Sequence, residues 1–362
     1  MENVVRLNVP FRQNATADRQ AALMDAFARH RRGPDDVFWM KENAEFLNIL
    51  ECTGARPGAG VLDLHRDFYD GLENRMGFFP QYYRFLLSLC LDLEDLGLDG
   101  DKGAALVDWV TQQGLVRAEM SDLQRAEARR LCLRRGVDPI ADDPGLEDRL
   151  RGFARRSETF SMPNKKAAYE LTHIVFYLSE YGRKDPRIDA ATRDSLIFAG
   201  TLAFLDFNAD LLAEICIALR FAGETPPEVW DIWLQQQMRC FGLEADPAGG
   251  LADDYHEYLM LNWYRALDGT GFRGQVPEGR VVFRRTRPTS GPLRELSECM
   301  FALGASRSGD WSLMRDRVAD RLSDEAQAAL AAAEAANAEF ARFFHGFARV
   351  GMRAPALQGA SA

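Results

Sequence analysis

The feature that most constrains the fold is a helix-length run that recurs along the chain and ends each time on glycine. Five runs of fourteen residues show it: KENAEFLNILECTG, RFLLSLCLDLEDLG, LQRAEARRLCLRRG, YELTHIVFYLSEYG and DLLAEICIALRFAG. They end at Gly54, Gly97, Gly136, Gly182 and Gly223, which are 43, 39, 46 and 41 residues apart. Apolar residues recur in them at helical spacing, and glycine readily adopts the left-handed cap of a helix.

Consecutive runs leave room for one further helix in each interval. A period near forty residues with two helices per unit is typical of stacked helical hairpins. PLRELSECMFALG, ending at Gly304, looks like another run, and LNWYRALDG, ending at Gly269, is a poorer one. We therefore predict an all-α fold of repeated helical hairpins that closes into an α/α toroid, with an open α-solenoid as the alternative.

The repeat and its flanks predict the domain organisation. We expect residues 16–350 to form a single helical-repeat domain, between a disordered N-terminus at 1–15 and a disordered tail at 351–362. One segment reads as extended, GRVVFRRTRP at 279–288, because it is rich in β-branched residues and is bracketed by glycine and proline. It predicts either a short hairpin or a loop.

Charge and composition exclude some classes of partner. The net charge of −10 argues against a nucleic-acid binder, because phosphate binding needs a basic face. We see neither a secretory leader nor an apolar run of about eighteen residues, so we expect no membrane partner. The six cysteines occur singly, without a CxxC motif. We expect them to be reduced, buried thiols in a cytoplasmic protein.

Aligning the runs on their glycines places a polar side chain nine residues before most of the caps. These residues are Glu45, Ser88, Glu127, His173, Glu214 and Glu295. Most positions around them are apolar, which suggests that they line a shared polar cavity. Glu127 lies in an arginine-rich run and is expected to face solvent instead.

The run ending at Gly182 carries the most chemistry. Glu170 and His173 are three residues apart on one helical face, with Tyr177 and aromatic residues beside them. A carboxylate next to a histidine orients the ring and suits proton transfer, although a purely structural pair is the alternative. A di-iron site would need a second ExxH motif, and we find only this one. The sequence leaves the cofactor unknown, and we predict no metal-ligating residues.

These patterns give a set of candidate site residues. We predict catalytic roles for His173, Glu170 and Glu214, and substrate-binding roles for Glu45, Tyr177 and Glu295. A second motif, Asp253-Asp254-x-x-Glu257, matches the DDxxE pattern of magnesium-dependent prenyl-diphosphate enzymes. Acids at the start of a helix are favoured by its dipole in any case, and no second metal motif follows.

The stretches ELTHIVFYLSEYG and NADLLAEICIALRFAG are similar to an uncharacterised bacterial all-helical family of unknown function, over most of the chain. The hairpin count also resembles the α/α barrels of several glycosidases and terpenoid cyclases, without their DxDD or QW motifs. Neither resemblance implies an activity. We predict an acid- and histidine-lined central cavity that binds or transforms a small molecule; the alternative is a helical scaffold that binds a protein or peptide.

Overall fold

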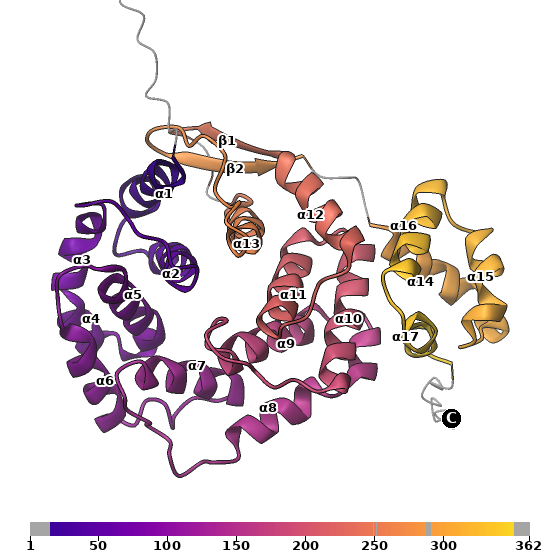
Figure 1. Cartoon of the computed structure of the whole chain (residues 1–362), viewed down its shortest axis with the longest axis horizontal. Helices are drawn as coiled ribbons and strands as arrows, with labels where there is room; N and C mark the ends of the chain where they lie inside the picture. Colours follow the sequence, from indigo (N-terminus) through magenta and orange to yellow (C-terminus); the bar gives the residue numbers. More distant parts are fainter. Residues whose placement is uncertain (1–14, 249, 251, 287–290, 351–362) are drawn as a thin grey trace, which may run out of the picture. The chain divides into compact units, whose positions relative to one another are not determined.

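The computed structural model describes residues 15–248, 250, 252–286 and 291–350. This part of the chain contains seventeen α-helices and one two-stranded sheet, so the all-α prediction is confirmed (Figure 1). The predicted disordered ends, 1–15 and 351–362, lie outside the described residues except for Ala15, which precedes the first helix. None of the helices in the described ranges is long and apolar enough to cross a membrane.

The chain divides into two compact units. Unit 1 comprises Met1–Pro144 and Gln237–Thr286, and unit 2 comprises Gly145–Gln236 and Arg287–Ala362. The single domain that we expect over 16–350 stays a prediction.

Unit 1 holds most of the N-terminal repeats and a later segment of the chain. Its elements are α1 (Thr16–Asp25), α2 (Val37–Cys52), α3 (Arg66–Asp70), α4 (Leu72–Phe78), α5 (Tyr83–Leu96), α6 (Lys102–Gln112), α7 (Asp122–Leu133), β1 (Phe241–Ala245), α13 (Tyr255–Ala266) and β2 (Val281–Arg285). Helix α2 packs against α5, α5 packs against α7, and α13 packs against α2. Four glycine-ended helices thus form a row in the order α13, α2, α5, α7. In this row α13, the last of the four along the chain, lies beside α2, the first of them.

The sheet of unit 1 accounts for the extended segment. Strand β2 pairs antiparallel with β1, so that Phe241 lies opposite Arg285 and Ala245 opposite Val281. The extended prediction is confirmed for 281–285, where Val281 and Phe283 are buried. The partner strand was not predicted, because its sequence FGLEA follows a helix with no clear turn signal.

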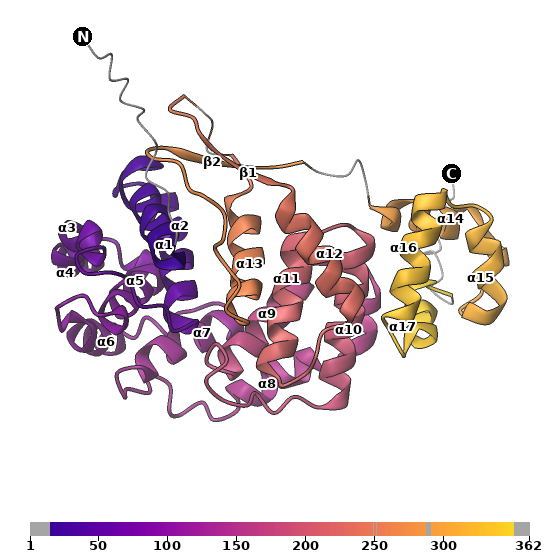
Figure 2. The same ribbon diagram turned by 45° about the horizontal axis from the view of Figure 1, so that its top comes forward.

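Unit 2 contains the remaining helices. They are α8 (Leu146–Ala154), α9 (Lys165–Leu178), α10 (Ala190–Leu205), α11 (Ala209–Phe221), α14 (Pro292–Ala302), α15 (Trp311–Ala319), α16 (Asp324–Ala335) and α17 (Phe340–Phe347), with α12 (Glu228–Arg239) except its last three residues. Helices α9 and α11 lie side by side (Figure 2), and α10 packs against both. Helices α14 and α16 pack against α10 and against each other.

The predicted glycine caps are confirmed throughout the described repeats. Each glycine has a positive φ: Gly54 (69°), Gly97 (109°), Gly136 (77°), Gly182 (86°), Gly223 (77°), Gly269 (76°) and Gly304 (51°). One helix occupies each interval from α5 to α13, namely α6, α8, α10 and α12, whereas the short helices α3 and α4 share the interval between α2 and α5. The repeat read from the sequence is therefore a real structural unit.

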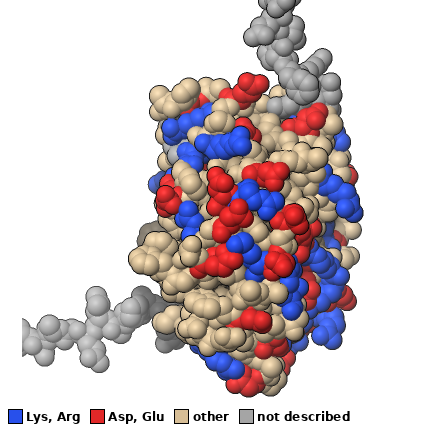
Figure 3. Space-filling model, turned by 90° about the vertical axis from the view of Figure 1, so that its left-hand side faces the viewer, with Lys and Arg blue, Asp and Glu red and all other residues tan. Residues whose placement is uncertain are grey.

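Acidic and basic residues are intermixed over the face drawn in Figure 3, as is typical of a solvated surface with ion pairs. Four of the six cysteines are buried, Cys52 is half-buried and Cys240 is exposed, so the expectation of a buried thiol is wrong at Cys240. Cys240 directly follows the end of α12, where the helical packing that buries the other thiols stops.

Candidate functional site

Neighbouring glycine-ended helices bring equivalent positions into contact within each unit. We number these positions back from the cap glycine, as −9 and −13. The contacting pairs are Arg84–Glu127 and His256–Glu45 in unit 1, and Tyr169–Asp210 and His173–Glu214 in unit 2. Each pair joins two different helices. The repeat therefore turns the −9 and −13 side chains of a unit toward neighbouring helices, and Glu127, expected in solvent, is partly buried against Arg84.

His173, on α9, is oriented by its own helix. Its Nδ1 lies 2.8 Å from the backbone oxygen of Tyr169. Because a carbonyl oxygen only accepts hydrogen bonds, Nδ1 carries the proton, and Nε2 of the neutral ring keeps its lone pair. The side chain is 36% exposed. His173 is therefore arranged to accept a hydrogen bond or a proton at Nε2.

Glu214, on α11, provides the carboxylate behind this ring. Its side chain is 3% exposed, and its Oε2 accepts a hydrogen bond of 2.6 Å from the Thr172 hydroxyl. The same Oε2 lies 3.8 Å from Nδ1 of His173. The buried carboxylate of Glu214 thus lies on the Nδ1 side of the ring, and Nε2 is on the opposite side.

A second hydroxyl–carboxylate pair lies one helical turn away. The phenol of Tyr169 donates a hydrogen bond of 2.6 Å to Oδ2 of Asp210. Burial, and then the charge of Asp210, raise the pKa of Tyr169. The phenol thus stays protonated at neutral pH and serves as a donor, which fixes the Asp210 carboxylate beside the His173–Glu214 pair.

The predicted partner of His173 on its own helix takes a different role. An oxygen of Glu170 lies 3.9 Å from Nζ of Lys166, one turn earlier, and the Glu170 side chain is 37% exposed. The carboxylate that faces the ring of His173 is instead Glu214, on the neighbouring helix. Three-residue spacing placed Glu170 and His173 on one face, but it did not determine which carboxylate meets the imidazole.

The other two predicted residues of unit 2 lie in different surroundings. Tyr177 is 9% exposed, and its ring centre is 5.9 Å from that of His173 in an edge-to-face contact. Glu295, on α14, accepts hydrogen bonds from the backbone N (3.0 Å) and the hydroxyl (2.9 Å) of Ser323, which precedes α16. Glu295 thereby links α14 to the first turn of α16.

Glu45, the predicted binding residue of unit 1, belongs to a cluster of its own. Its Oε1 lies 3.6 Å from Nε2 of His256 on α13 and 3.7 Å from Nζ of Lys41. Burial and the nearby Glu45 carboxylate raise the pKa of Tyr255, whose phenol bonds to Glu45. Sequence reasoning missed His256. The signal was available, because His256 is at −13 from Gly269, the cap of the shortest run.

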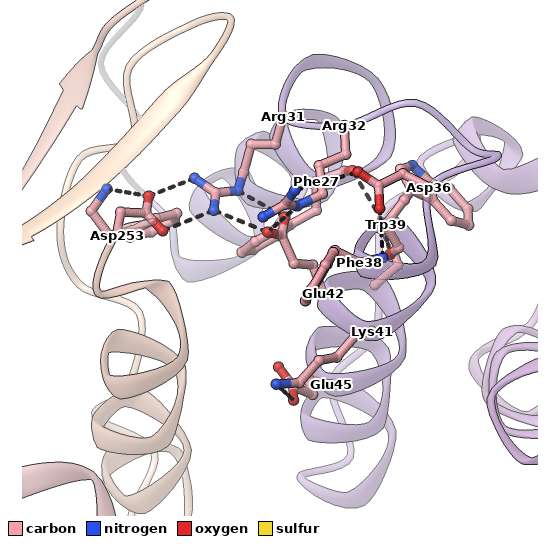
Figure 4. A network of polar contacts seen from close by, with 12 residues as sticks. Phe27, Arg31, Arg32, Asp36, Phe38, Trp39, Lys41, Glu42, Glu45 and Asp253 are labelled. Atoms are coloured by element: carbon pink, nitrogen blue, oxygen red, sulfur yellow. Dashed lines mark hydrogen bonds and ion pairs between the residues drawn. The ribbon is translucent and has the colours of Figure 1, made fainter. Parts of the chain in front are cut away.

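The DDxxE motif is engaged by arginines and by backbone amides. Asp253 binds the buried guanidinium of Arg31 (Figure 4) and also accepts a hydrogen bond from the backbone N of Phe283. Asp254 accepts a hydrogen bond from the backbone N of Arg285, and Glu257 pairs with the Arg285 side chain at 3.0 Å. The three acids of the motif are thus bound within unit 1 by the side chains of Arg31 and Arg285 and by backbone amides.

The comparison with known families gives the relationship of this chain. Residues 1–350 match the family model described as Domain of unknown function (DUF6902). The chain belongs to this family. No curated protein and no solved structure matches it. The resemblance to an all-helical family of unknown function is thus confirmed, and the chemistry of this DUF6902 member has to be argued from its own residues.

The arrangement in unit 2 favours proton transfer and hydrogen bonding. His173 presents one ring nitrogen, because Nδ1 is bonded to Tyr169. Glu214 stands behind the ring, and the hydroxyls of Tyr169 and Thr172 hold the two carboxylates in place. An imidazole oriented by a backbone carbonyl and supported by a carboxylate is the usual composition of a general base.

Proposed function

We propose that this DUF6902 protein binds a small polar molecule at the face formed by α9 and α11 of unit 2, and that His173 accepts a hydrogen bond or a proton from it. The orientation of His173 by Tyr169, with the buried Glu214 behind the ring, carries the proposal. Tyr177 supports the ring from its edge. The roles expected for Glu170 and Glu295 stay predictions; their carboxylates lie near Lys166 and Ser323, respectively.

Glu45 is a second candidate binding residue, in unit 1. Like Glu214 and His173, Glu45 and His256 pair across two glycine-ended helices, although Glu45 lies near Nε2 of its histidine and Glu214 near Nδ1. The proposal therefore includes a polar site on the α2–α13 face. Substituting Glu45 by Gln is expected to weaken the binding of any ligand found there, and to leave binding at the His173 site unchanged.

A ligand screen by thermal shift tests the main site. We expect a compound from a metabolite library to raise the melting temperature of the wild-type protein and to lose this effect in His173→Gln and Glu214→Gln. Glu170→Gln is the matched control, because it changes a carboxylate on the same helix that pairs with Lys166. The proposal fails if both site variants respond to the same compounds as the wild type does.

The toroid is our proposal for the architecture. It is supported by the return of the chain within unit 1, where α13 packs against α2. In an open solenoid the last repeat lies far from the first, because each repeat contacts only its neighbours. Small-angle X-ray scattering tests it: a closed ring gives a short maximum dimension, and an elongated profile would contradict closure.

The cellular location and partner class also remain proposals. We propose a cytoplasmic protein, supported by cysteines that occur singly along the sequence. We also propose that it has no nucleic-acid partner, supported by the net charge of −10. Fractionation of cells that express a tagged chain tests the location. The nucleic-acid content of the purified protein, before and after nuclease treatment, tests the partner class.

A further inference from the structure

Unit 2 contains a pocket at the end of α9 and α11 where both helices begin. Most of its wall is apolar and comes from the segment before α9 and from α10, α11 and α14: Phe160, Ala199, Leu202, Ala203, Leu211 and Leu293. The free volume of this unit 2 pocket is about 30 Å³, whereas one water molecule needs about 10–15 Å³. The pocket therefore has room for about two or three groups of the size of a methyl.

Two opposite charges lie side by side at the mouth of the unit 2 pocket. Nζ of Lys165 lies 2.7 Å from Oδ2 of Asp206, and both residues belong to the pocket lining. The Lys165 side chain is 65% exposed and the Asp206 side chain is 30% exposed, so water reaches both. An ion pair that is open to water adds little to stability. A ligand that carries both charges therefore replaces it without a large loss of stability.

The fold fixes the turn that carries Asp206. The next residue, Phe207, has a positive φ of 51°, which is a strained conformation for a residue with a side chain. Its ring stacks on that of Trp233 on α12, with the ring centres 5.8 Å apart. A Cβ atom at Gly291 would lie 2.5 Å from the backbone carbonyl carbon of Asp206, so the start of α14 packs against the same turn. The Asp206 carboxylate is thus held at the pocket before any ligand arrives.

The two asparagines of the pocket lining fix the helix ends beside the charged pair. The side-chain oxygen of Asn164 accepts a hydrogen bond of 3.1 Å from the backbone N of Ala167, and that of Asn208 accepts one of 3.1 Å from the backbone N of Leu211. Each asparagine is the N-cap of its helix. Lys165 is the first residue of α9, where the helix dipole favours an anion in addition to the charge of the lysine.

We infer that the unit 2 pocket binds a small, branched α-amino acid such as valine. Its isopropyl group consists of about three methyl-sized units, as many as the pocket holds. The carboxylate and the ammonium of an amino acid are attached to the same carbon, so the carboxylate pairs with Lys165 while the ammonium pairs with Asp206. This site is separate from the one proposed for His173, which lies about two helical turns further along α9.

Isothermal titration with valine, isovalerate, isobutylamine and phenylalanine tests the inference. Isovalerate lacks the ammonium of valine, and isobutylamine lacks the carboxylate. We expect each to bind about tenfold more weakly than valine, because one charge of the pocket then has no partner in the ligand. Phenylalanine keeps both charges, but its ring exceeds the free volume, so it should also bind more weakly than valine.

Substitutions of the charged pair test the same site from the side of the protein. Lys165→Gln and Asp206→Asn should each weaken valine binding about tenfold, and they should barely change the melting temperature, because the pair is open to water. Lys166→Gln is the matched control. It removes the same charge from the next residue, which is 88% exposed and does not line the pocket, so valine binding should stay as in the wild type.

Unchanged valine binding in Lys165→Gln and Asp206→Asn overturns the inference, as does a wild type that binds none of the four compounds. If valine binding depends on His173 and not on Lys165, the amino acid belongs to the site of the proposed function and this inference fails. If valine binding depends on Lys165 and Asp206 while no compound depends on His173, this inference stands and the proposed function fails.

Discussion

Substituting Asp253 by Ala is expected to destabilise unit 1 strongly. The guanidinium of Arg31 is fully buried and binds both oxygens of Asp253, at 2.8 and 3.0 Å (Figure 4). It also donates to Glu42, at 2.9 and 3.2 Å, and to the backbone oxygen of Val281 at 2.6 Å. Asp253 belongs to the segment that returns to the N-terminal helices, so this pair holds the two parts of unit 1 together.

The magnitude follows from what the substitution leaves behind. Without Asp253, the guanidinium of Arg31 stays buried beside Glu42, whose carboxylate also binds Arg32 at 2.7 Å. Arg31 and Arg32 would then both bind the Glu42 carboxylate, with the Asp36 carboxylate 3.4 Å from Arg32. Removing one partner of a buried ion pair typically lowers the free energy of unfolding by about 3–5 kcal/mol. Such a loss is a large part of the free energy of unfolding of a typical protein, which is about 5–15 kcal/mol.

Urea unfolding followed by circular dichroism measures the loss. Asp142→Ala is the control, because Asp142 forms an exposed pair with Arg117 and should change nothing measurable. In the double variant Arg31→Met with Asp253→Leu, both charges are replaced by apolar groups, so part of the stability should return. A loss below about 1 kcal/mol in Asp253→Ala would refute the reasoning, because it would mean that Arg31 is hydrated or has another anion.

Two further predictions concern buried groups. Burial lowers the pKa of His65 to about 4 from 6.5, so below pH 6.5 the unfolded chain binds more protons than the folded one. The wild type should therefore lose about 2 kcal/mol of unfolding free energy at pH 5 relative to pH 7, a loss that His65→Gln lacks in urea titrations at both pH values. Gly182→Ala should lower the unfolding free energy by about 1–3 kcal/mol more than Gly54→Ala. Both glycines have positive φ, but only the added Cβ at Gly182 meets a ring; equal losses would show that Phe221 moves aside.

The caps were predictable from the sequence because glycine has a conformational property of its own. Positive φ at Gly97 and Gly223 follows from the residue type and from its place after an apolar run. The early end of α9 was not predictable, because Glu180 and Tyr181 adopt a conformation that their residue types disfavour. Only tertiary contacts, such as that of Gly182 with Phe221, reveal why the chain turns there.

The candidate site was predictable in part. Alignment on the glycines selected His173 and Glu214 together, and the two side chains do meet. The pairing of Glu170 with His173 rested on spacing within one helix, and Lys166, four residues before Glu170, offers the opposite charge at the favoured distance. Sequence spacing gives the face on which a side chain lies, while the choice among partners on that face depends on rotamers.

The success of the glycine alignment has a geometric cause. Two helices joined through one reversing helix, such as α9 and α11, run in the same direction, so residues equally far from their caps lie at equal heights. Positions −9 and −13 differ by four residues, which is about 6 Å along a helix, within reach of a glutamate or histidine side chain. The same rule accounts for the contact between His256 and Glu45, where −13 meets −9. Counting back from every cap glycine, the poorer run at Gly269 included, would have identified His256 from the sequence.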